Sequence, residues 1–551
     1  MQTPPVTLVN WLLALSPIAV VLVLMVGFRW GGQKAGPVGW VVGLLVAWLF
    51  FGAGPVVLFY SQVQALLLSL FVLYIIWMAL VLYRVVDEAS AIAVTGRGIA
   101  RLTGDPVMQL LLLGWGFSSF LQGVAAFGVP IAVVAPLLIG MGFAPLVAVA
   151  SVAIGHSWSV TFGSMSSSFL ALMAATDLPG MVLAPWSAAF LGVACLGCGI
   201  GTVWVYRGWA SVRHGAPALL LMAAVMVAVQ TGLAVVGLWT LAGFVAGLAG
   251  LGCGALLTRL PRYRGRPDAA PAALPPTPLR SGDWRQSPPL HNAERATGGR
   301  TGEGRPLSLG LALVPYLILF VVVTAAQLVP WLKDVLNRVE IGVPVPELRT
   351  GYGWITAAGA GRTISIFGHA GALLAYVSLI SFLLYSLTGH YAPGAGQRIV
   401  HSAVRSAIPA TIGILSMVGF AVAMDYSGMT YVLAQGLVRV AGPLYPVVAP
   451  FIGLLGAFMT GSNTNSNVVF APLQQEAAAA LGISALIILG AQTTGGAVGS
   501  MIAPAKLILG CSTAGCPGRE GEVLKKTLPP ALLICLVVGL VALGAVLLRA
   551  G

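Results

Sequence analysis

The sequence predicts an all-α polytopic membrane protein made of two inverted-topology repeats, with roughly ten to twelve transmembrane helices plus re-entrant hairpins and broken helices. Three observations predict this fold. The chain is 58% hydrophobic and only 8% charged, its mean hydropathy is +0.95, and one sequence motif occurs twice. Because the backbone must satisfy its own hydrogen bonds inside lipid, apolar runs in such a chain are expected to be helices.

The duplicated motif occupies residues 101–123 and 439–461. Four residues recur 338 positions later: Arg101, Gly104, Phe120 and Gly123 return as Arg439, Gly442, Phe458 and Gly461. The tetrapeptide beginning at Phe162 returns, with valine in place of phenylalanine, as the one beginning at Val498. This duplication indicates two homologous halves, and transporters built in this way bind substrate near the middle of the membrane, where the halves meet.

The candidate spans divide between the halves. Apolar runs that approach or exceed the length needed to cross about 30 Å of hydrocarbon are 7–27, 37–59, 63–83, 107–127, 128–154, 184–206, 216–237, 238–258, 307–329, 366–388, 407–424, 446–459, 480–500 and 527–549. We therefore predict an N-terminal transmembrane repeat over 1–259 and a C-terminal repeat over 307–551. Between them, 260–306 is rich in Pro, Gly and Arg and is predicted to be a solvated linker.

The formal charge of +13 does not indicate nucleic-acid binding, because the basic residues form no groove or recognition face. They lie in short loops and in the linker, which predicts a cytoplasmic position for 84–105 and 260–306 under the positive-inside rule. The N-terminus has no basic segment before its first apolar run, so it is not expected to be a cleaved signal peptide. Both termini are predicted to lie outside.

This orientation predicts that the halves are inverted. Three spans lead from the outside to the cytoplasmic loop 84–105, before the first copy of the motif. Spans 307–329, 366–388 and 407–424 lead instead from the cytoplasmic linker to an outer loop before the second copy. The balanced charge of 331–349 agrees with an outer position for that loop.

Polar breaks interrupt both halves. Residues 461–467 read Gly-Ser-Asn-Thr-Asn-Ser-Asn, and unmatched polar groups at membrane depth cost several kcal/mol each. Ser, Thr and Asn are also N-cap residues, so a half-helix starting here would direct free N–H groups and its positive dipole end at an anion. The corresponding turn in the first half is 122–130. A second polar break follows in each half, at 155–168 and at 492–500.

The sequence of these segments resembles the L-lactate permease family of bacterial proton-coupled carboxylate importers. The resemblance lies in SFLQGVAAFGVPIAVVAPLLIGMGF, MDYSGMTYVLA, GLLGAFMTGSNTNSNVVFAPLQ and GAQTTGGAVGSMIAP. The tripeptide at 462–464 is also similar to the hairpin-tip motif of the wider ion-transporter superfamily. The resemblance implies proton-driven import of L-lactate, glycolate or a related 2-hydroxy monocarboxylate across the bacterial inner membrane.

The chain departs from the family pattern at four places. Gln122 stands where members usually have glutamate, and Val124-Ala125-Ala126 replaces an alanine/glycine pair. Asp425 replaces an asparagine, and Lys506 replaces a small or polar residue. A lysine near the site could pair with a second negative group on the substrate. The alternative function is therefore transport of another small organic anion, a dicarboxylate or a sulfonated acid, with proton or sodium coupling.

The predicted site follows from the breaks and from the resemblance. The candidate substrate-binding residues are Gln122, Gly123, Ser157, Ser164, Ser462, Asn463, Thr464, Asn465, Thr493, Thr494 and Lys506. His156 and Asp425 are the candidate proton-coupling groups, since imidazole titrates near about pH 6.5 and intramembrane ionisable residues usually serve function. Structural alternatives remain open: Gln122 as an interhelical hydrogen bond, Asp425 as a solvated group at the outer interface, and Lys506 as a snorkelling side chain.

Other functional classes find little support. The segment 155–159 loosely resembles a serine-nucleophile turn but lacks its second glycine, and neither a P-loop nor an HExxH motif occurs. We therefore expect a secondary transporter and not an enzyme or a primary pump, with no metal and no cofactor; a channel is the weaker alternative. The expected partners are a small organic anion, a proton and membrane lipid, without nucleic acid, and the sequence is compatible with a homo-oligomer.

Overall fold

The computed structural model describes residues 4–28, 30–124, 128–264 and 307–550. Most of the predicted linker, 265–306, and the tip of the first polar break, 125–127, lie outside the described residues. The helices of the first half are α1 (Leu8–Val26), α2 (Gly32–Phe51), α3 (Pro55–Glu88), α4 (Ala91–Ala100), α5 (Pro106–Gln109), α6 (Ser118–Val124), α7 (Val129–Gly140), α8 (Pro145–Gly155), α9 (Ser167–Thr176), α10 (Gly180–Arg207), α11 (Trp209–Val235) and α12 (Trp239–Leu257). A π-helical stretch, Leu110–Phe117, joins α5 to α6, and single 3-10 turns occupy Ser157–Ser159 and Pro261–Tyr263.

The second half is also mainly helical. Its helices are α14 (Leu309–Leu328), α15 (Pro330–Leu336), α16 (Ala370–Leu387), α17 (Ala395–Tyr426), α18 (Met429–Ala441), α19 (Tyr445–Thr460), α20 (Asn463–Leu481), α21 (Ala485–Gly499), α22 (Pro504–Thr513) and α23 (Glu520–Ala550), with a 3-10 turn at Gly442–Leu444. Four short strands lie between α15 and α16: β1 (Glu340–Gly342), β2 (Leu348–Arg349), β3 (Ile355–Thr356) and β4 (Thr363–Ser365).

Thirteen segments of the described chain are long and apolar enough to cross a membrane, which confirms the polytopic helical fold. They differ in how much of their surface the protein itself covers. Within an apolar 18-residue stretch of each segment, the protein buries 94% of Pro106–Val124 and 89% of Ala485–Thr513, against 22% of Leu8–Val26. The two segments that carry or adjoin the polar breaks therefore form the centre of the molecule, and α1 belongs to its periphery.

The strands form a small antiparallel extension that the sequence did not predict. β1 pairs with β4 and β2 with β3, and a bridge joins Val345 to Gly359. The buried amide of Gln64 on α3 holds the extension, because its Nε2 donates to Val343 O at 2.8 Å and its Oε1 accepts from Arg362 N at 2.9 Å. The loop expected after 331 is thus fastened to a membrane helix.

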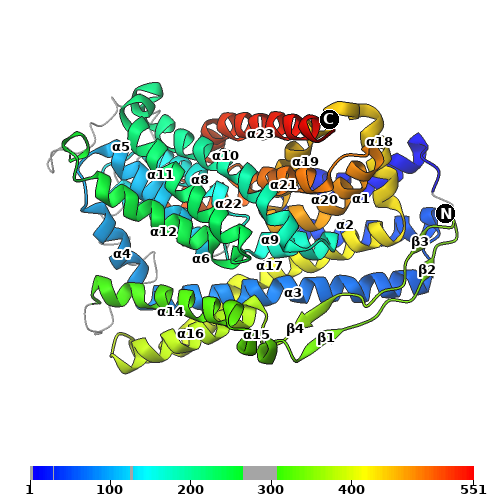
Figure 1. Ribbon diagram of the computed structural model, residues 1–551, viewed down its shortest axis with the longest axis horizontal. Helices are drawn as coiled ribbons and strands as arrows, with labels where there is room; N and C mark the ends of the chain where they lie inside the picture. The colour runs from blue at the N-terminus through cyan, green and yellow to red at the C-terminus, as the bar shows by residue number, and fades with distance from the viewer. Residues whose placement is uncertain (1–3, 29, 125–127, 265–306, 551) are drawn as a thin grey trace.

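The linker begins and ends at one end of the molecule, beside α4 and α5. Gly104 N donates to Arg264 O at 3.1 Å, and Thr103 donates to Tyr263 O. Leu309 lies against Gly98. In Figure 1, α4 and α5 are at the left, whereas the start of α1, the strands β2 and β3 and the end of α23 lie toward the right.

The order and packing of the helices repeat between the halves. The series α1, α2, α3, α4 has lengths of 19, 20, 34 and 10 residues, and α14, α16, α17, α18 have 20, 18, 32 and 13. Contacts between the halves occur in pairs, with the roles of the two halves exchanged. The contact of α10 with α21 corresponds to that of α23 with α8, and the contact of α9 with α20 corresponds to that of α22 with α7. This exchange agrees with a two-fold relation between the halves. The orientation of such an axis in a membrane stays a prediction.

Candidate functional site

A small cavity of about 30 Å³ lies where the polar breaks of the two halves meet. Its walls come from α3, α6, α9, α20, α22 and the turns before α9 and α20. The lining residues are Ile76, Gln122, Val160, Ser164, Ser167, Ser168, Gly461, Ser462, Asn463, Thr464 and Lys506. Six of the eleven sequence-predicted substrate-binding residues, Gln122, Ser164, Ser462, Asn463, Thr464 and Lys506, therefore share one cavity.

The second-half wall is the N-terminus of α20. Gly461 has φ +70°, a left-handed conformation that glycine adopts without a Cβ clash, and it turns the chain from α19 into α20. The side chain of Ser462 accepts from Asn465 N at 3.3 Å and caps the helix. The sequence-predicted cap is thus present, and the first turn of α20 directs its N–H groups and positive dipole end toward the cavity.

The first-half wall is the N-terminus of α9, which follows an unusual turn. Ser164, Met165 and Ser166 have φ of 48°, 54° and 60°, a left-handed run that is costly for residues other than glycine. Backbone contacts hold it, because Ser164 N donates to Gln122 O at 2.7 Å and Met165 N to Gly123 O at 3.1 Å. This pairing places Gln122 and Ser164 side by side, with Gln122 Nε2 3.4 Å from Ser164 Oγ.

Three hydrogen bonds join the walls. The hydroxyls of Ser168 and Thr464 lie 3.0 Å apart, Asn463 Nδ2 donates to Thr161 Oγ1 at 3.0 Å, and Asn467 Nδ2 donates to Ser168 O at 2.9 Å. Two helix N-termini from different halves therefore meet at the cavity. Because each N-terminus carries partial positive charge, the pair forms a field that favours an anion.

Several predicted residues lie behind the cavity wall. Thr493 Oγ1 accepts from Asn467 Nδ2 at 2.8 Å and so supports α20. The hydroxyl of Thr494 donates to Gly490 O within its own helix. Asn465 supplies the capped N–H, Gly123 packs against the backbone of Phe244, and Ser157 Oγ donates to Ala153 O and accepts from Ser500 at 3.4 Å. We interpret these five as positions that support the site.

Unpaired acceptors lie around the site. Among the described residues, the side-chain oxygens of Gln122, Asn463 and Asn467 are buried without a hydrogen-bond partner. A buried acceptor left unpaired costs about 1–3 kcal/mol, so these atoms are suited to water or a ligand hydroxyl. The assignment of oxygen and nitrogen within each amide follows from the hydrogen-bond network.

Lys506 is the charged residue of the cavity wall. It stands in the first turn of α22, after Ala503 as N-cap, and only 7% of the residue is exposed. Among the residues that the structure describes, the side chains that line the cavity include no acid. An intramembrane ammonium without a carboxylate beside it is costly, and such residues usually mark a substrate or ion path.

The two predicted proton-coupling residues lie in different places. His156 is fully buried at the end of α8, where Nδ1 lies 2.6 Å from Val152 O and Nε2 has no partner among the described residues. It interacts electrostatically with Lys506 without lining the cavity. Asp425, at the end of α17, interacts instead with Glu476, Arg362 and Asp177. Their roles stay predictions.

The substrate-binding residues predicted from the sequence did not include four polar residues and two apolar residues in or beside the cavity wall. Thr161, Ser167, Ser168 and Asn467 belong to the polar breaks, so the composition of the breaks was a sufficient signal for them. Ile76 and Val160 are apolar members of the wall. Nothing in the apolar pattern of α3 distinguishes Ile76 from its buried neighbours.

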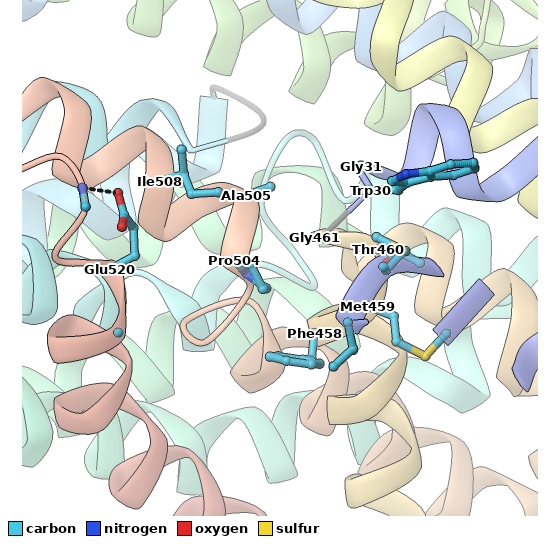
Figure 2. Close-up of a pocket in the computed structure, with 15 residues that line it drawn as sticks. Trp30, Gly31, Phe458, Met459, Thr460, Gly461, Pro504, Ala505, Ile508 and Glu520 are labelled. Atoms are coloured by element: carbon cyan, nitrogen blue, oxygen red, sulfur yellow. Dashed lines mark hydrogen bonds between the residues drawn. The ribbon is translucent and has the colours of Figure 1, made fainter. Parts of the chain in front are cut away.

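A larger cavity of about 530 Å³ begins at the tip of the second-half hairpin. Gly461 lines both cavities. Figure 2 shows Thr460 and Gly461 between Trp30 on one side and Pro504, Ala505 and Ile508 of α22 on the other. Glu520, the acidic residue of this wall, accepts from Gly518 N at 2.9 Å, the dashed contact in Figure 2. The larger cavity thus reaches the hairpin tip that separates it from the small one.

Comparison with known proteins gives matches along nearly the whole chain. The family model described as L-lactate permease matches residues 10–549. The L-lactate permease of Salmonella typhi is 27% identical over 544 residues, covering 96% of this chain and 94% of that protein. Glycolate permease GlcA of Escherichia coli K12 is 25% identical, with coverages of 97% and 95%.

A solved structure, the YdaH transporter of Alcanivorax borkumensis, also resembles this chain. It is 14% identical with a TM-score of 0.45, and the match covers 88% of this chain and 87% of that one.

Proposed function

This chain belongs to the L-lactate permease family, and we propose that it is a secondary active transporter that imports L-lactate or a related small 2-hydroxy monocarboxylate, such as glycolate, by proton symport. The substrate class rests on the family and on relatives named L-lactate permease and glycolate permease. The protein is a multi-pass membrane protein, and lipid is its surrounding partner.

One observation carries the proposal: two helix N-termini and a buried lysine converge on a cavity whose described lining residues include no acid. Such a site offers N–H groups, hydroxyls and an ammonium, all of which stabilise a carboxylate. The same groups would destabilise a cation. An organic anion is therefore the ligand that this arrangement fits.

The remaining cavity groups suit a short 2-hydroxy acid. We assign the carboxylate to the N-termini of α20 and α9 and to Lys506. The 2-hydroxyl can both donate and accept, which suits the amides of Gln122 and Asn463. Ile76 and Val160 then lie where a small alkyl group, such as the methyl of lactate, avoids unpaired polar contacts.

The small cavity is far below the volumes of about 300–1,000 Å³ typical of ligand pockets. We propose that the site opens by movement of the hairpin tip at Gly461, toward the larger cavity next to it. Access would then alternate between the two ends of the inverted repeats.

The test is transport by the purified protein in proteoliposomes. An inward proton gradient should drive saturable accumulation of L-lactate, and unlabelled glycolate should compete. The opposite result, flux that is linear in concentration and indifferent to the proton gradient, would indicate a channel.

The same vesicles separate the remaining alternatives. The buried cation at Lys506 favours a second candidate, an anion with an additional negative group. If a small dicarboxylate or a sulfonated acid competes more strongly than L-lactate, the substrate class changes while the anion site stands. A sodium gradient applied at equal pH distinguishes sodium coupling from proton coupling.

A further inference from the structure

The position of Lys506 leads to an inference about how proton and substrate are coupled. We propose that the amine of Lys506 itself carries the coupled proton, so that proton and substrate cross the membrane together as one ammonium–carboxylate pair. This proposal rests on the proposed function, the proton-coupled import of a small carboxylate. It assigns to one side chain both the anchoring of the anion and the binding of the proton.

The first step of the argument is that the ammonium lacks a counter-ion in the protein. Within the described part of the chain, Lys506 belongs to no ion pair. The cavity wall includes Gln122 and Asn463, whose side chains are neutral, and no carboxylate. The substrate is thus the anion available to pair with Lys506 in the site.

The helices packed against α22 supply no direct acid partner either. These are α7, α8 and α23. α7 and α8 contain no titratable residue, and His156, just after α8, is itself a base. α23 begins with Glu520, Glu522, Lys525 and Lys526, but Glu520 faces the larger cavity and Glu522 pairs with Arg519 at 2.7 Å. The walls from α3, α6, α9 and α20 contribute only uncharged side chains to the cavity.

The second step is the linkage between proton and anion. Burial of an ammonium without a counter-ion costs several kcal/mol, which makes the neutral amine accessible, whereas a carboxylate in contact favours the ammonium. Each ligand therefore strengthens the binding of the other. Reciprocal coupling of this kind is what a symporter needs, because the carrier should seldom hold one ligand alone.

The proton balance of the cycle is simple. On the outer side the neutral amine takes up one proton and the site takes up one carboxylate, which gives a neutral ammonium–carboxylate pair. On the cytoplasmic side the carboxylate and the proton both leave to water, and the neutral amine returns. The site is neutral in both crossings, so import of a monoanion moves one proton and no net charge.

His156 has a different position. Its Nδ1 is committed to Val152 O, and the ring does not line the cavity. Because it lies close enough to interact with the Lys506 charge, a protonated His156 would oppose the ammonium. We therefore assign to His156 an influence on Lys506 and not the coupled proton itself.

The main test replaces Lys506 by arginine, which stays protonated in proteins. Lys506→Arg should keep exchange of labelled for unlabelled substrate within about tenfold of wild type, since the anion still meets a cation. Accumulation driven by a pH difference should be lost, whereas wild type should approach tenfold accumulation per pH unit for one proton per anion. Uptake by Lys506→Arg should respond instead to an inside-positive membrane potential. Lys525→Arg, the same change at an exposed lysine of α23, is the matched control.

Two further measurements keep the proposal falsifiable if Lys506→Arg does not fold, as judged by its elution profile and thermal stability. Calorimetry of L-lactate binding at alkaline pH, where the amine of the empty site is neutral, in two buffers of different ionisation enthalpy should give uptake of close to one proton by wild type. His156→Gln should retain both this proton uptake and accumulation. Binding without proton uptake, accumulation driven by a pH difference in a folded Lys506→Arg, or loss of proton uptake in His156→Gln would each overturn the proposal. If wild type exchanges no small carboxylate at all, the proposed function fails instead.

Discussion

Asn463 makes one of the side-chain hydrogen bonds that join the two halves at the candidate site. It is 99% buried, its Nδ2 donates to Thr161 Oγ1 at 3.0 Å, and it lines the cavity. Its Oδ1 has no partner among the described residues, which leaves that atom available to accept from a substrate hydroxyl. The residue therefore both fixes the geometry of the walls and offers a contact.

We predict that Asn463→Ala raises the apparent substrate KM by roughly tenfold or more, because one or two buried hydrogen bonds of about 1–1.5 kcal/mol are lost. Initial rates of labelled L-lactate uptake over a concentration series measure this effect. Asn337→Ala, just after α15 and outside the cavity wall, is the control. Equal changes in both variants would count against a role of Asn463 in binding.

At the scale of single residues, the sequence predicted the polar half of the site better than the apolar half. Ser462, Asn463 and Thr464 were predictable because hydrogen-bonding side chains are costly inside a membrane and need a purpose. Ile76 was not, since an isoleucine on an apolar helix carries no such signal. The left-handed turn at Ser164 was also hidden, because serine favours no such conformation by itself.

At the scale of elements, glycines allow the central helices to approach closely. A Cβ on Gly495 of α21 would lie 1.8 Å from Pro450 O of α19, and one on Gly155 of α8 would lie 1.9 Å from Gly114 O. Such distances require backbone movement. In each half, therefore, the helix that leads into the second polar break, α8 or α21, packs closely on the segment that leads into the first polar break.

We predict that Gly495→Ala destabilises the protein by about 3 kcal/mol, at the upper end of the cost of overpacking. Its melting temperature in detergent, measured by intrinsic fluorescence, should fall by several degrees. Gly232→Ala on α11 has nothing within 4 Å of the added Cβ and should leave the melting temperature unchanged or slightly raised. A Gly495→Ala protein as stable as Gly232→Ala would show that α19 and α21 are not closely packed.

Helix elements were predictable from apolar length, and the breaks from Gly and polar clusters, because both follow from the cost of exposing backbone to lipid. The strands between 340 and 365 were not. They are two or three residues long, and they depend on distant partners such as Gln64 for their placement. Local sequence contains little information about such pairing.

At the scale of the whole molecule, basic residues gather at the end of the molecule where the described chain approaches the linker. The helix ends and loops there contain Arg97, Arg101, Arg207, Arg213, Arg259, Arg262 and Arg264, with Asp105 close to His214 at 2.9 Å. The segment from α15 to β2 has mixed charge, with Asp334, Glu340 and Glu347 close in sequence to Lys333, Arg338 and Arg349, and its β2 end lies away from α4 and α5 in Figure 1. The asymmetry agrees with a cytoplasmic position for the linker end.

Two single-cysteine variants test the predicted membrane orientation. Glu347→Cys and Arg213→Cys place a thiol on exposed positions near opposite ends of the molecule. In intact cells a membrane-impermeant maleimide should label Glu347→Cys and leave Arg213→Cys unlabelled, whereas inverted vesicles should give the reverse. The unsubstituted protein is the background control, since five of its six cysteines are buried and Cys253 is half-buried. Residue 347 belongs to the second half and residue 213 to the first. Labelling of both from one side of the membrane would therefore exclude the predicted topology. It would also exclude the inversion of the halves, on which alternating access depends.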